Sequence, residues 1–178
     1  VEALSELEER QGRVETMAHT RMQAALPVAA SRKIRSWREP LLRHRDRMTV
    51  LENEIAILHF GGAVGSLDKL GDKGVGVSRR LAGKLGLGTV IRARHSERDG
   101  QVALANWLSM VSGSLGKMGQ DIALLAQTEV GEIRLASGGG SSAMPHKVNP
   151  VRAEVLVALA RFNATLVSGM HHSLVHEG

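Results

Sequence analysis

The sequence contains no cysteine and no tyrosine, and it has only two phenylalanines and two tryptophans. Without cysteine the chain forms neither disulfides nor thiolate metal sites, and a reducing compartment is expected. Because 43% of the 178 residues are nevertheless hydrophobic, the core must be built from Ala, Leu, Val and Met. Aliphatic side chains of this kind suit closely packed helices.

Long apolar runs are also missing. None approaches the roughly 20 residues that a membrane-spanning helix needs, and residues 1–10 do not resemble a signal peptide. We therefore expect a cytoplasmic protein with no membrane partner. The chain starts without Met, directly in a helical pattern, and stops at Gly178 without a closing element. Residues 1–178 are expected to be one central helical-bundle domain from a longer polypeptide.

Basic residues concentrate between positions 32 and 47 of a chain whose formal charge is +5. Such a stripe can bind nucleic acid, but Trp37 is the only aromatic residue within it and no known reader motif accompanies it. A solvated helix face or an ion-paired subunit surface is favoured, so no nucleic-acid partner is expected. A non-catalytic helical bundle that binds nucleic acid through this stripe is the alternative of another class.

The dominant pattern along the chain is helical. Apolar residues recur at steps of three and four over positions 104–125, which predicts a long helix in a bundle. The same spacing predicts helices over about 4–18, 48–58 and 150–175, and glycine clusters bracket a short helix that carries Leu81 and Leu85. No segment alternates apolar and polar residues convincingly, so the expected fold class is all-α without a substantial sheet. The last helix is expected to face inward with Val151, Val155, Leu159, Phe162, Leu166 and Met170.

The longest break, residues 131–149, ends in a glycine- and serine-rich segment. Asn149 followed by Pro150 predicts a helix start, with Asn as the cap and Pro as the first helical residue. The positive end of the helix dipole would then lie beside Lys147 and the hydroxyls of Ser141 and Ser142. These groups together suit a carboxylate or a developing oxyanion. The alternative is a plain linker between two helices.

Histidines supply further acid–base candidates. His19 and His95 are possible proton-transfer groups, although a surface or packing role is the favoured interpretation for each. His172 and His176 are four residues apart, as in a metal pair, but no carboxylate or third histidine accompanies them in the sequence. We therefore expect no metal and no other cofactor.

Residues 140–150, GSSAMPHKVNP, resemble the signature GSSxMPxKxNP of the fumarase/aspartase superfamily. Residues 20–27, TRMQAALP, look like its second region, Thr-His-x-Gln-x-Ala-x-Pro. Residues 95–99 and 127–132 look like the segments that precede its longest helix and its mobile loop. The resemblance implies a long-helix bundle in which helices from several subunits form the core of a homotetramer. It also implies active sites shared between subunits, and the superfamily's first signature region is missing from the chain.

Within the superfamily, residues 43–47 and 60–72 look most like the carboxymuconate cycloisomerase branch. Its members close a lactone by adding a carboxylate to a double bond in protocatechuate catabolism, the β-ketoadipate pathway. The implied partner is a small polycarboxylate substrate. Adenylosuccinate lyase or a related fumarate-releasing lyase is the alternative, because residues 127–132 and the segment around Lys147 are shared with that branch.

The resemblance also implies roles for individual residues. Ser141 would transfer the proton, and Lys147 with the helix start would stabilise the developing charge. Many superfamily members have histidine where this chain has Arg21, and a guanidinium that stays protonated near neutral pH cannot shuttle protons. Arg21 is instead expected to clamp a carboxylate through two hydrogen bonds. The full set of expected substrate-binding residues is Thr20, Arg21, Gln23, Ser142, Met144 and Asn149.

Overall fold

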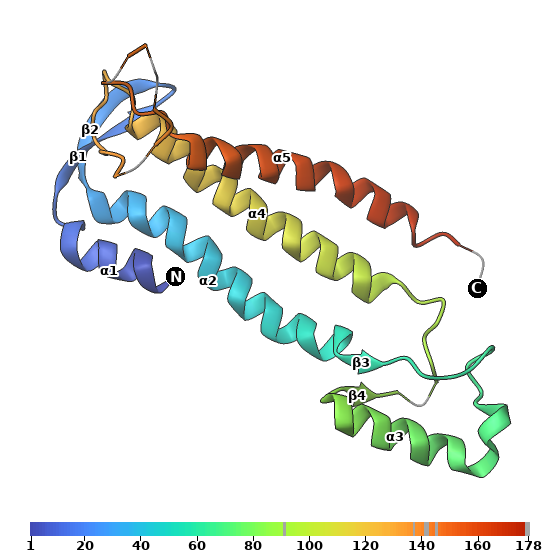
Figure 1. Ribbon diagram of the computed structural model, residues 1–178. Coiled ribbons are helices and arrows are strands. Elements are labelled where there is room, and N and C mark those ends of the chain that lie inside the picture. The colour runs from blue at the N-terminus through green and yellow to red at the C-terminus, as the bar shows by residue number, and fades with distance from the viewer. Residues whose placement is uncertain (91, 137, 141–142, 145, 177–178) are drawn as a thin grey trace. The chain divides into compact units, whose positions relative to one another are not determined.

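The chain is mostly helical, as predicted. The computed structural model describes residues 1–90, 92–136, 138–140, 143–144 and 146–176 (Figure 1). By contact density the chain divides into two compact units, residues 1–45 with 109–165, and residues 46–108 with 166–178. The helices are α1 Glu2–Gln11, α2 Ala30–Ile55, α3 Gly74–Leu85, α4 Asp99–Leu125 and α5 Val151–His172, with a short 3-10 helix, η1, at Asp68–Lys73.

Two pairs of strands accompany these helices. β1 Glu15–Thr20 and β2 Gln23–Ala29 form an antiparallel hairpin, and the two-residue strands β3 Ile57–Leu58 and β4 Gly88–Thr89 pair in parallel. Helix α4 confirms the long helix predicted over 104–125. Helix α3 confirms the short helix that carries Leu81 and Leu85.

The hairpin is where the sequence interpretation was wrong. The helix predicted over 4–18 ends at Gln11, because the chain leaves it at Gly12, whose amide donates to the Glu8 carbonyl at 2.7 Å. A Cβ at Gly12 would lie 2.4 Å from that same carbonyl oxygen, so this exit requires glycine. The apolar spacing of the first helix continued past the exit by coincidence. The strands that follow are too short and irregular to show a clear alternation.

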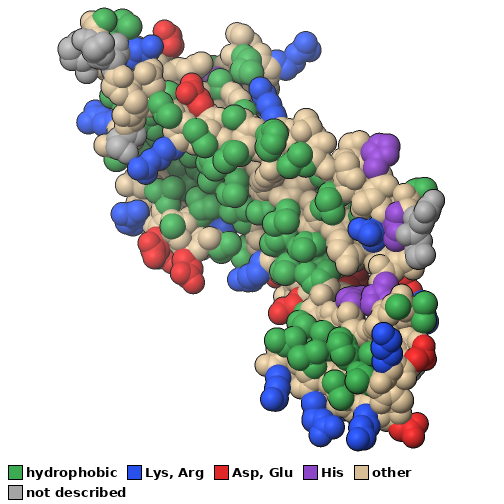
Figure 2. Space-filling view, turned by 45° about the vertical axis from the view of Figure 1, so that its right-hand side comes forward, with side chains coloured by type: hydrophobic (Ala, Val, Ile, Leu, Met, Phe, Trp, Pro, Cys, Tyr) green, Lys and Arg blue, Asp and Glu red, His purple; other side chains and the backbone are tan. Residues whose placement is uncertain are grey.

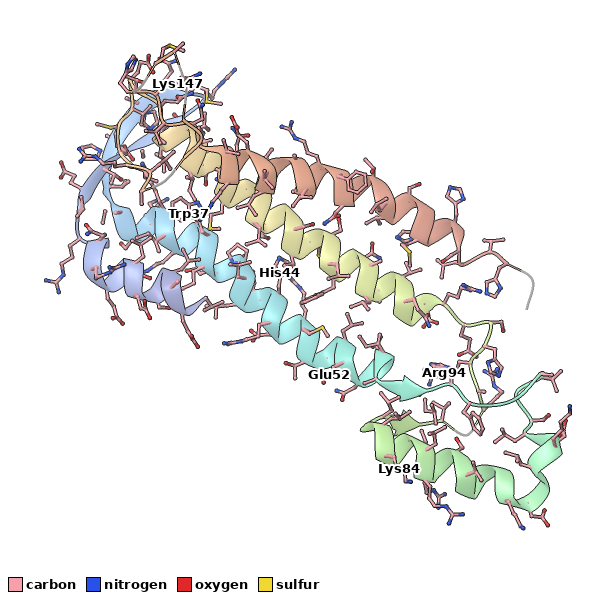
Figure 3. The ribbon with its side chains drawn as sticks, viewed as in Figure 1. Trp37, His44, Glu52, Lys84, Arg94 and Lys147 are labelled. Atoms are coloured by element: carbon pink, nitrogen blue, oxygen red, sulfur yellow. The ribbon has the colours of Figure 1, made fainter. Side chains whose placement is uncertain are left out.

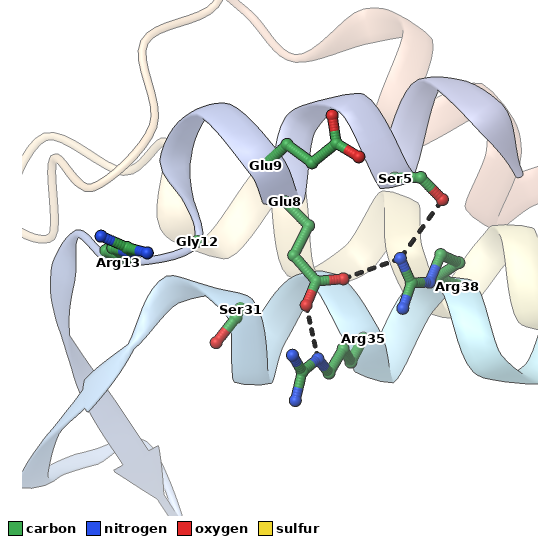
Figure 4. Close-up of a pocket in the computed structure, with 8 residues that line it drawn as sticks. All are labelled: Ser5, Glu8, Glu9, Gly12, Arg13, Ser31, Arg35 and Arg38. Carbon is green, nitrogen blue, oxygen red and sulfur yellow. Dashed lines mark hydrogen bonds and ion pairs between the residues drawn. The ribbon is translucent and has the colours of Figure 1, made fainter.

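Helix α1 is held on α2 by one carboxylate. Glu8 lies between the guanidinium groups of Arg35 and Arg38, and Arg38 also donates to the Ser5 hydroxyl at 3.2 Å (Figure 4). Part of the basic stripe predicted over 32–47 is therefore engaged in ion pairs within the chain. Because these pairs lie within one chain, the expected ion-paired surface between subunits stays a prediction.

Polar pairs fix the contact between α2 and α4 in the first unit. The Trp37 Nε1 donates to Asp121 Oδ2 at 2.8 Å, and His44 Nε2 lies 2.9 Å from the Ser114 hydroxyl (Figure 3). Trp37 and His44 are both buried, with 7% and 6% of their surfaces exposed. Because buried polar groups are costly without partners, these pairs fix the position of α2 along α4.

Helices α4 and α5 approach each other through glycine. A Cβ at Gly116 would lie 2.4 Å from the Ala160 Cβ, and one at Gly119 would lie 2.6 Å from the Ala153 carbonyl oxygen. The apolar stripe predicted on α4 is only half-buried, and its Leu108 is 52% exposed. Small residues of α4 thus allow its close contact with α5, and the apolar pattern of the sequence did not indicate this contact.

The α5 residues predicted to face inward are open to solvent in the chain taken alone. Val151, Val155, Leu159, Phe162 and Leu166 are between 43% and 59% exposed. Figure 2 shows apolar side chains gathered on the visible surface. By length and composition alone, α5 is also long and apolar enough to span a membrane, although no such run was expected from the sequence. The charged residues Arg152, Glu154 and Arg161 interrupt its apolar stretch. An exposed apolar helix of this size calls for a covering partner.

The glycine contact predicts an asymmetric response to alanine along α4. Gly119→Ala should lower the free energy of unfolding by about 1–3 kcal/mol, because the Ala153 main chain cannot move aside as a side-chain end can. Gly113→Ala is the matched control, since a Cβ there meets nothing within 4 Å. It should leave stability unchanged or raise it by up to about 1 kcal/mol. Urea unfolding followed by circular dichroism measures both, and equal effects at the two positions would contradict the packing.

Candidate active site

The tip of the hairpin presents the second signature region in a fixed geometry. The turn consists of Arg21 and Met22, with φ of 50° and 65°, between the paired residues Thr20 and Gln23. Two successive residues with positive φ match the twist of a two-residue hairpin loop, which normally uses Asn-Gly or Gly-Gly. For Arg and Met this backbone conformation is strained, so the surrounding structure must hold it.

A cavity of about 480 Å³ lies beside the hairpin tip. Its walls come from His19, Arg21 and Met22 of the hairpin, from Lys33 and Trp37 of α2, and from the end of α4 with Gln127 just beyond it. Asp121 is the one carboxylate among the described lining residues, and it already accepts from the Trp37 Nε1 and pairs with Lys117. Lys33 is likewise paired with Glu132, so among the described lining residues Arg21 is the cation whose charge is left to attract an anionic ligand.

His19, one of the two acid–base candidates, sits on this wall. Its Nδ1 lies 3.1 Å from the Met17 carbonyl, and because a carbonyl can only accept, Nδ1 carries the proton and donates. That hydrogen bond fixes the orientation of the ring and its tautomer. His19 thus lines the cavity, although the sequence favoured a surface or packing role for it; its part in proton transfer stays a prediction.

The two ends of the signature loop, residues 138–150, are joined by main-chain hydrogen bonds. Gly139 and Asn149 exchange main-chain hydrogen bonds of 3.1 and 3.0 Å. A Cβ at Gly138 would lie 2.5 Å from the Asn149 carbonyl oxygen, and one at Gly139 would lie 2.6 Å from Val151 Cγ2. Gly138, just before the signature, is therefore needed for the close approach of the two ends, because the atom that a Cβ would meet there belongs to the main chain.

The structure describes some of the loop residues that the sequence predicted to belong to the site. Lys147 is exposed, and its amide donates to the Met144 carbonyl at 3.0 Å (Figure 3). Met144 is 42% exposed. Ser141 and Ser142 lie outside the described residues, so their predicted roles have no structural description.

The helix start differs by one residue from the sequence prediction. The first intrahelical hydrogen bond of α5 runs from the Glu154 amide to the Pro150 carbonyl at 3.0 Å. Pro150 is thus the residue before the helix rather than its first residue, and the main chain of Asn149 is taken by the bridge to Gly139. The positive end of α5 still follows the loop directly, so the predicted effect of its dipole on an anion is retained.

The predicted residues fall into three places. Thr20, Arg21 and Gln23 form the hairpin tip, and Met144, Lys147 and Asn149 lie in the closed loop; both are parts of the first unit. His95 lies in the second unit, where a Cβ at Gly61 would come within 2.8 Å of its Nε2.

Several residues at the site were not singled out from the sequence. Lys117 and Asp121 line the cavity, and their spacing of four residues on a helix was the available signal. Lys33 was counted only as part of the basic stripe, yet it pairs with Glu132, a residue of the segment that resembles the approach to the mobile loop. Among the described residues, no group of three or more His, Asp or Glu side chains is arranged to hold a metal ion.

The chain matches a known protein family, curated relatives and solved structures. A family model described as "Lyase" matches residues 1–163. The chain is 40% identical, over 99% of its length, to a 3-carboxy-cis,cis-muconate cycloisomerase of Pseudomonas aeruginosa. It matches the crystal structure of the 3-carboxy-cis,cis-muconate lactonizing enzyme from Pseudomonas putida with a TM-score of 0.89 and 38% identity over 99% of the chain.

A more distant relative belongs to another branch. The adenylosuccinate lyase of Pyrococcus horikoshii is 31% identical over 98% of the chain. The chain spans 39% of the length of the two cycloisomerases and 40% of that of the lyase. The matches extend over both units, the hairpin and the loop. The chain therefore belongs to the lyase family of the fumarase/aspartase superfamily.

Proposed function

We propose that the protein containing this chain is a 3-carboxy-cis,cis-muconate cycloisomerase of protocatechuate catabolism. The similarity to cycloisomerases over nearly the whole chain carries the proposal. Arg21 at the cavity beside the hairpin tip supports it, because the proposed substrate bears three carboxylates. Cytoplasmic location fits a chain without cysteine.

The reaction is intramolecular. One substrate carboxylate oxygen forms a bond to an alkene carbon, and the alkene electron pair moves toward the neighbouring carbon, which is conjugated with a second carboxylate. That carboxylate becomes an enediolate with extra negative charge until the carbon takes up a proton. Stabilising this charge is the main catalytic demand, since only interactions that strengthen in the transition state accelerate the step.

The residues divide this task between loop and hairpin. Ser141 transfers the proton, while Lys147, the main-chain amides of Ser142 and Met144, and the start of α5 stabilise the added charge. Thr20, Arg21, Gln23 and Asn149 bind the substrate carboxylates. Arg21 supplies a planar pair of donors where other superfamily members place a histidine, which suits a substrate with an additional carboxylate.

A homotetramer with shared active sites completes the proposal. The chain alone buries few large side chains, and the apolar residues of α5 are about half exposed. In the proposed assembly, helices from several subunits cover these residues and form a common core. A small polycarboxylate is the only ligand required, with no cofactor.

Replacing the proposed proton-transfer residue tests the chemistry directly. Ser141→Ala in the complete protein should lower kcat for lactone formation by about 10²–10⁴-fold, because proton transfer would lose its positioned group. Circular dichroism should stay unchanged. Ser137→Ala removes a hydroxyl from the same stretch of chain outside the signature and should retain full activity. Full activity in Ser141→Ala would show that another group transfers the proton.

The proposed carboxylate clamp makes a separate prediction. Arg21→Gln should raise KM by about 10–100-fold, the usual cost of losing a charged hydrogen-bonding partner, and should change kcat less. Arg21→Lys should recover only part of the affinity, because an ammonium cannot form the paired hydrogen bonds. Arg32→Gln removes a charge from an exposed position on α2 and serves as the control. Equal KM values for the two Gln variants would contradict the clamp.

Adenylosuccinate lyase activity is the second candidate, favoured by the 31% identity to that enzyme. Lactone formation and fumarate release are both read by ultraviolet absorbance on separate substrates. Lactone formation from 3-carboxy-cis,cis-muconate without fumarate release from adenylosuccinate is the expected result. The reverse result would assign the protein to the lyase branch.

A further inference from the structure

The approach to the signature loop is fastened to strand β1 by a closed set of contacts. The Met17 amide donates to Glu132 Oε1 at 2.9 Å, and the Lys33 Nζ donates to the Met17 carbonyl at 2.9 Å. Lys33 and Glu132 Oε2 form an ion pair that closes the set. Three separate parts of the first unit, namely β1, α2 and the segment after α4, thus meet at one residue of the hairpin.

These contacts satisfy main-chain groups on the edge of β1 that does not pair with β2. The Ala30 amide donates to the Val14 carbonyl at 2.8 Å, and in an antiparallel pair every second residue faces the partner strand. Met17 is three residues further along, so its amide and carbonyl face away from β2. Unpaired main-chain groups at a strand edge need partners. Glu132 supplies the acceptor and Lys33 the donor that a third strand would otherwise provide.

Glu132 is itself tightly placed. Its amide donates to the Leu125 carbonyl at 3.0 Å, and the Ile133 amide donates to the same oxygen at 3.1 Å, so the chain folds back onto the end of α4. The Glu132 and Lys33 side chains are only 15% and 20% exposed. A partly buried ion pair is screened less than a surface pair. The Glu132 carboxylate therefore fixes the position of β1 relative to the end of α4.

The hairpin tip needs such a support. Arg21 and Met22, the strained turn, follow Met17 by four and five residues, and the strand register between Met17 and His19 is irregular. A strained non-glycine turn persists only where neighbouring structure holds it. Among the described residues, the Lys33 and Glu132 side chains join β1 to α2 and to the segment after α4.

We propose that Glu132, acting with Lys33 through Met17, is a positioning residue that holds the hairpin tip in place for substrate binding. The inference rests on the proposed function, because it assigns the tip residues Thr20, Arg21 and Gln23 to the substrate carboxylates. It adds that the contacts of Glu132 couple the position of the segment before the signature loop to that of the proposed carboxylate-binding turn. A displacement of one would then displace the other.

Kinetics on the complete protein give the first test. Glu132→Ala should raise KM for 3-carboxy-cis,cis-muconate by about tenfold, as expected for the loss of a charged hydrogen-bond partner, with kcat changed less than about threefold. Glu132→Gln keeps an acceptor for the Met17 amide and should recover part of the affinity. Glu129→Ala removes an exposed carboxylate from the same turn and is the matched control. A Glu132→Ala variant that lost thermal stability but kept its KM would show that the contact contributes to stability and not to substrate binding.

Amide hydrogen exchange gives a second test that does not depend on activity. In Glu132→Ala, peptides covering residues 16–24 should exchange at least about tenfold faster, because the Met17 amide loses its acceptor and the turn its support. Peptides from 104–120 should exchange as in the wild type. Unchanged exchange in 16–24 would overturn the positioning role even in an active enzyme. Faster exchange in a protein without lactone-forming activity would instead support the positioning role and reject the proposed function.

Discussion

The close contact of α4 with α5 is the constraint on which the site depends. At Gly119 the Ala153 main chain occupies the space that any side chain would need, and at Gly116 the Ala160 methyl does the same. This contact fixes where α5 begins relative to the end of α4. The signature loop must therefore span a set distance between two fixed helix ends, and the bridge between Gly139 and Asn149 closes its base.

The hairpin is tied to the same region by charge rather than by apolar packing. Its strands are largely exposed, and its open edge is satisfied by Glu132 and Lys33. Polar contacts are directional, so they can hold a strained turn at one angle where a small apolar contact would allow it to slide. Through Glu132, the hairpin and the segment before the loop are both held at the end of α4.

The electrostatics of the site are consistent with this construction. Carboxylates near the cavity are already paired, Asp121 with Trp37 and Lys117, and Glu132 with Lys33 and Met17. Arg21 remains as a guanidinium at the exposed tip, and the positive start of α5 follows the loop. Both groups would attract the carboxylates of the proposed substrate. The exposed apolar residues of α5 serve a different end, the proposed association of subunits.

The sequence by itself determined the long helices α4 and α5, the short helix between glycines and the composition of the signature loop, because each depends on residues close together in the chain. Of helix α2, Ala30–Ile55, it indicated only the part from residue 48. It identified Arg21 as a departure from the superfamily pattern for the same reason. Only the tertiary structure decided that residues 15–29 form a hairpin, that Gly116 and Gly119 bring α4 against α5, and that Glu132 meets Lys33 at Met17. Glu132 meets Lys33 and Met17 across 99 and 115 residues, and the contact of α4 with α5 depends on which helix face is covered. The strands of the hairpin lie close together in the chain, but they are too short and irregular to show a clear alternation. Local periodicity carries no information about such partners, because the same apolar stripe suits a core within one chain and a core shared between subunits.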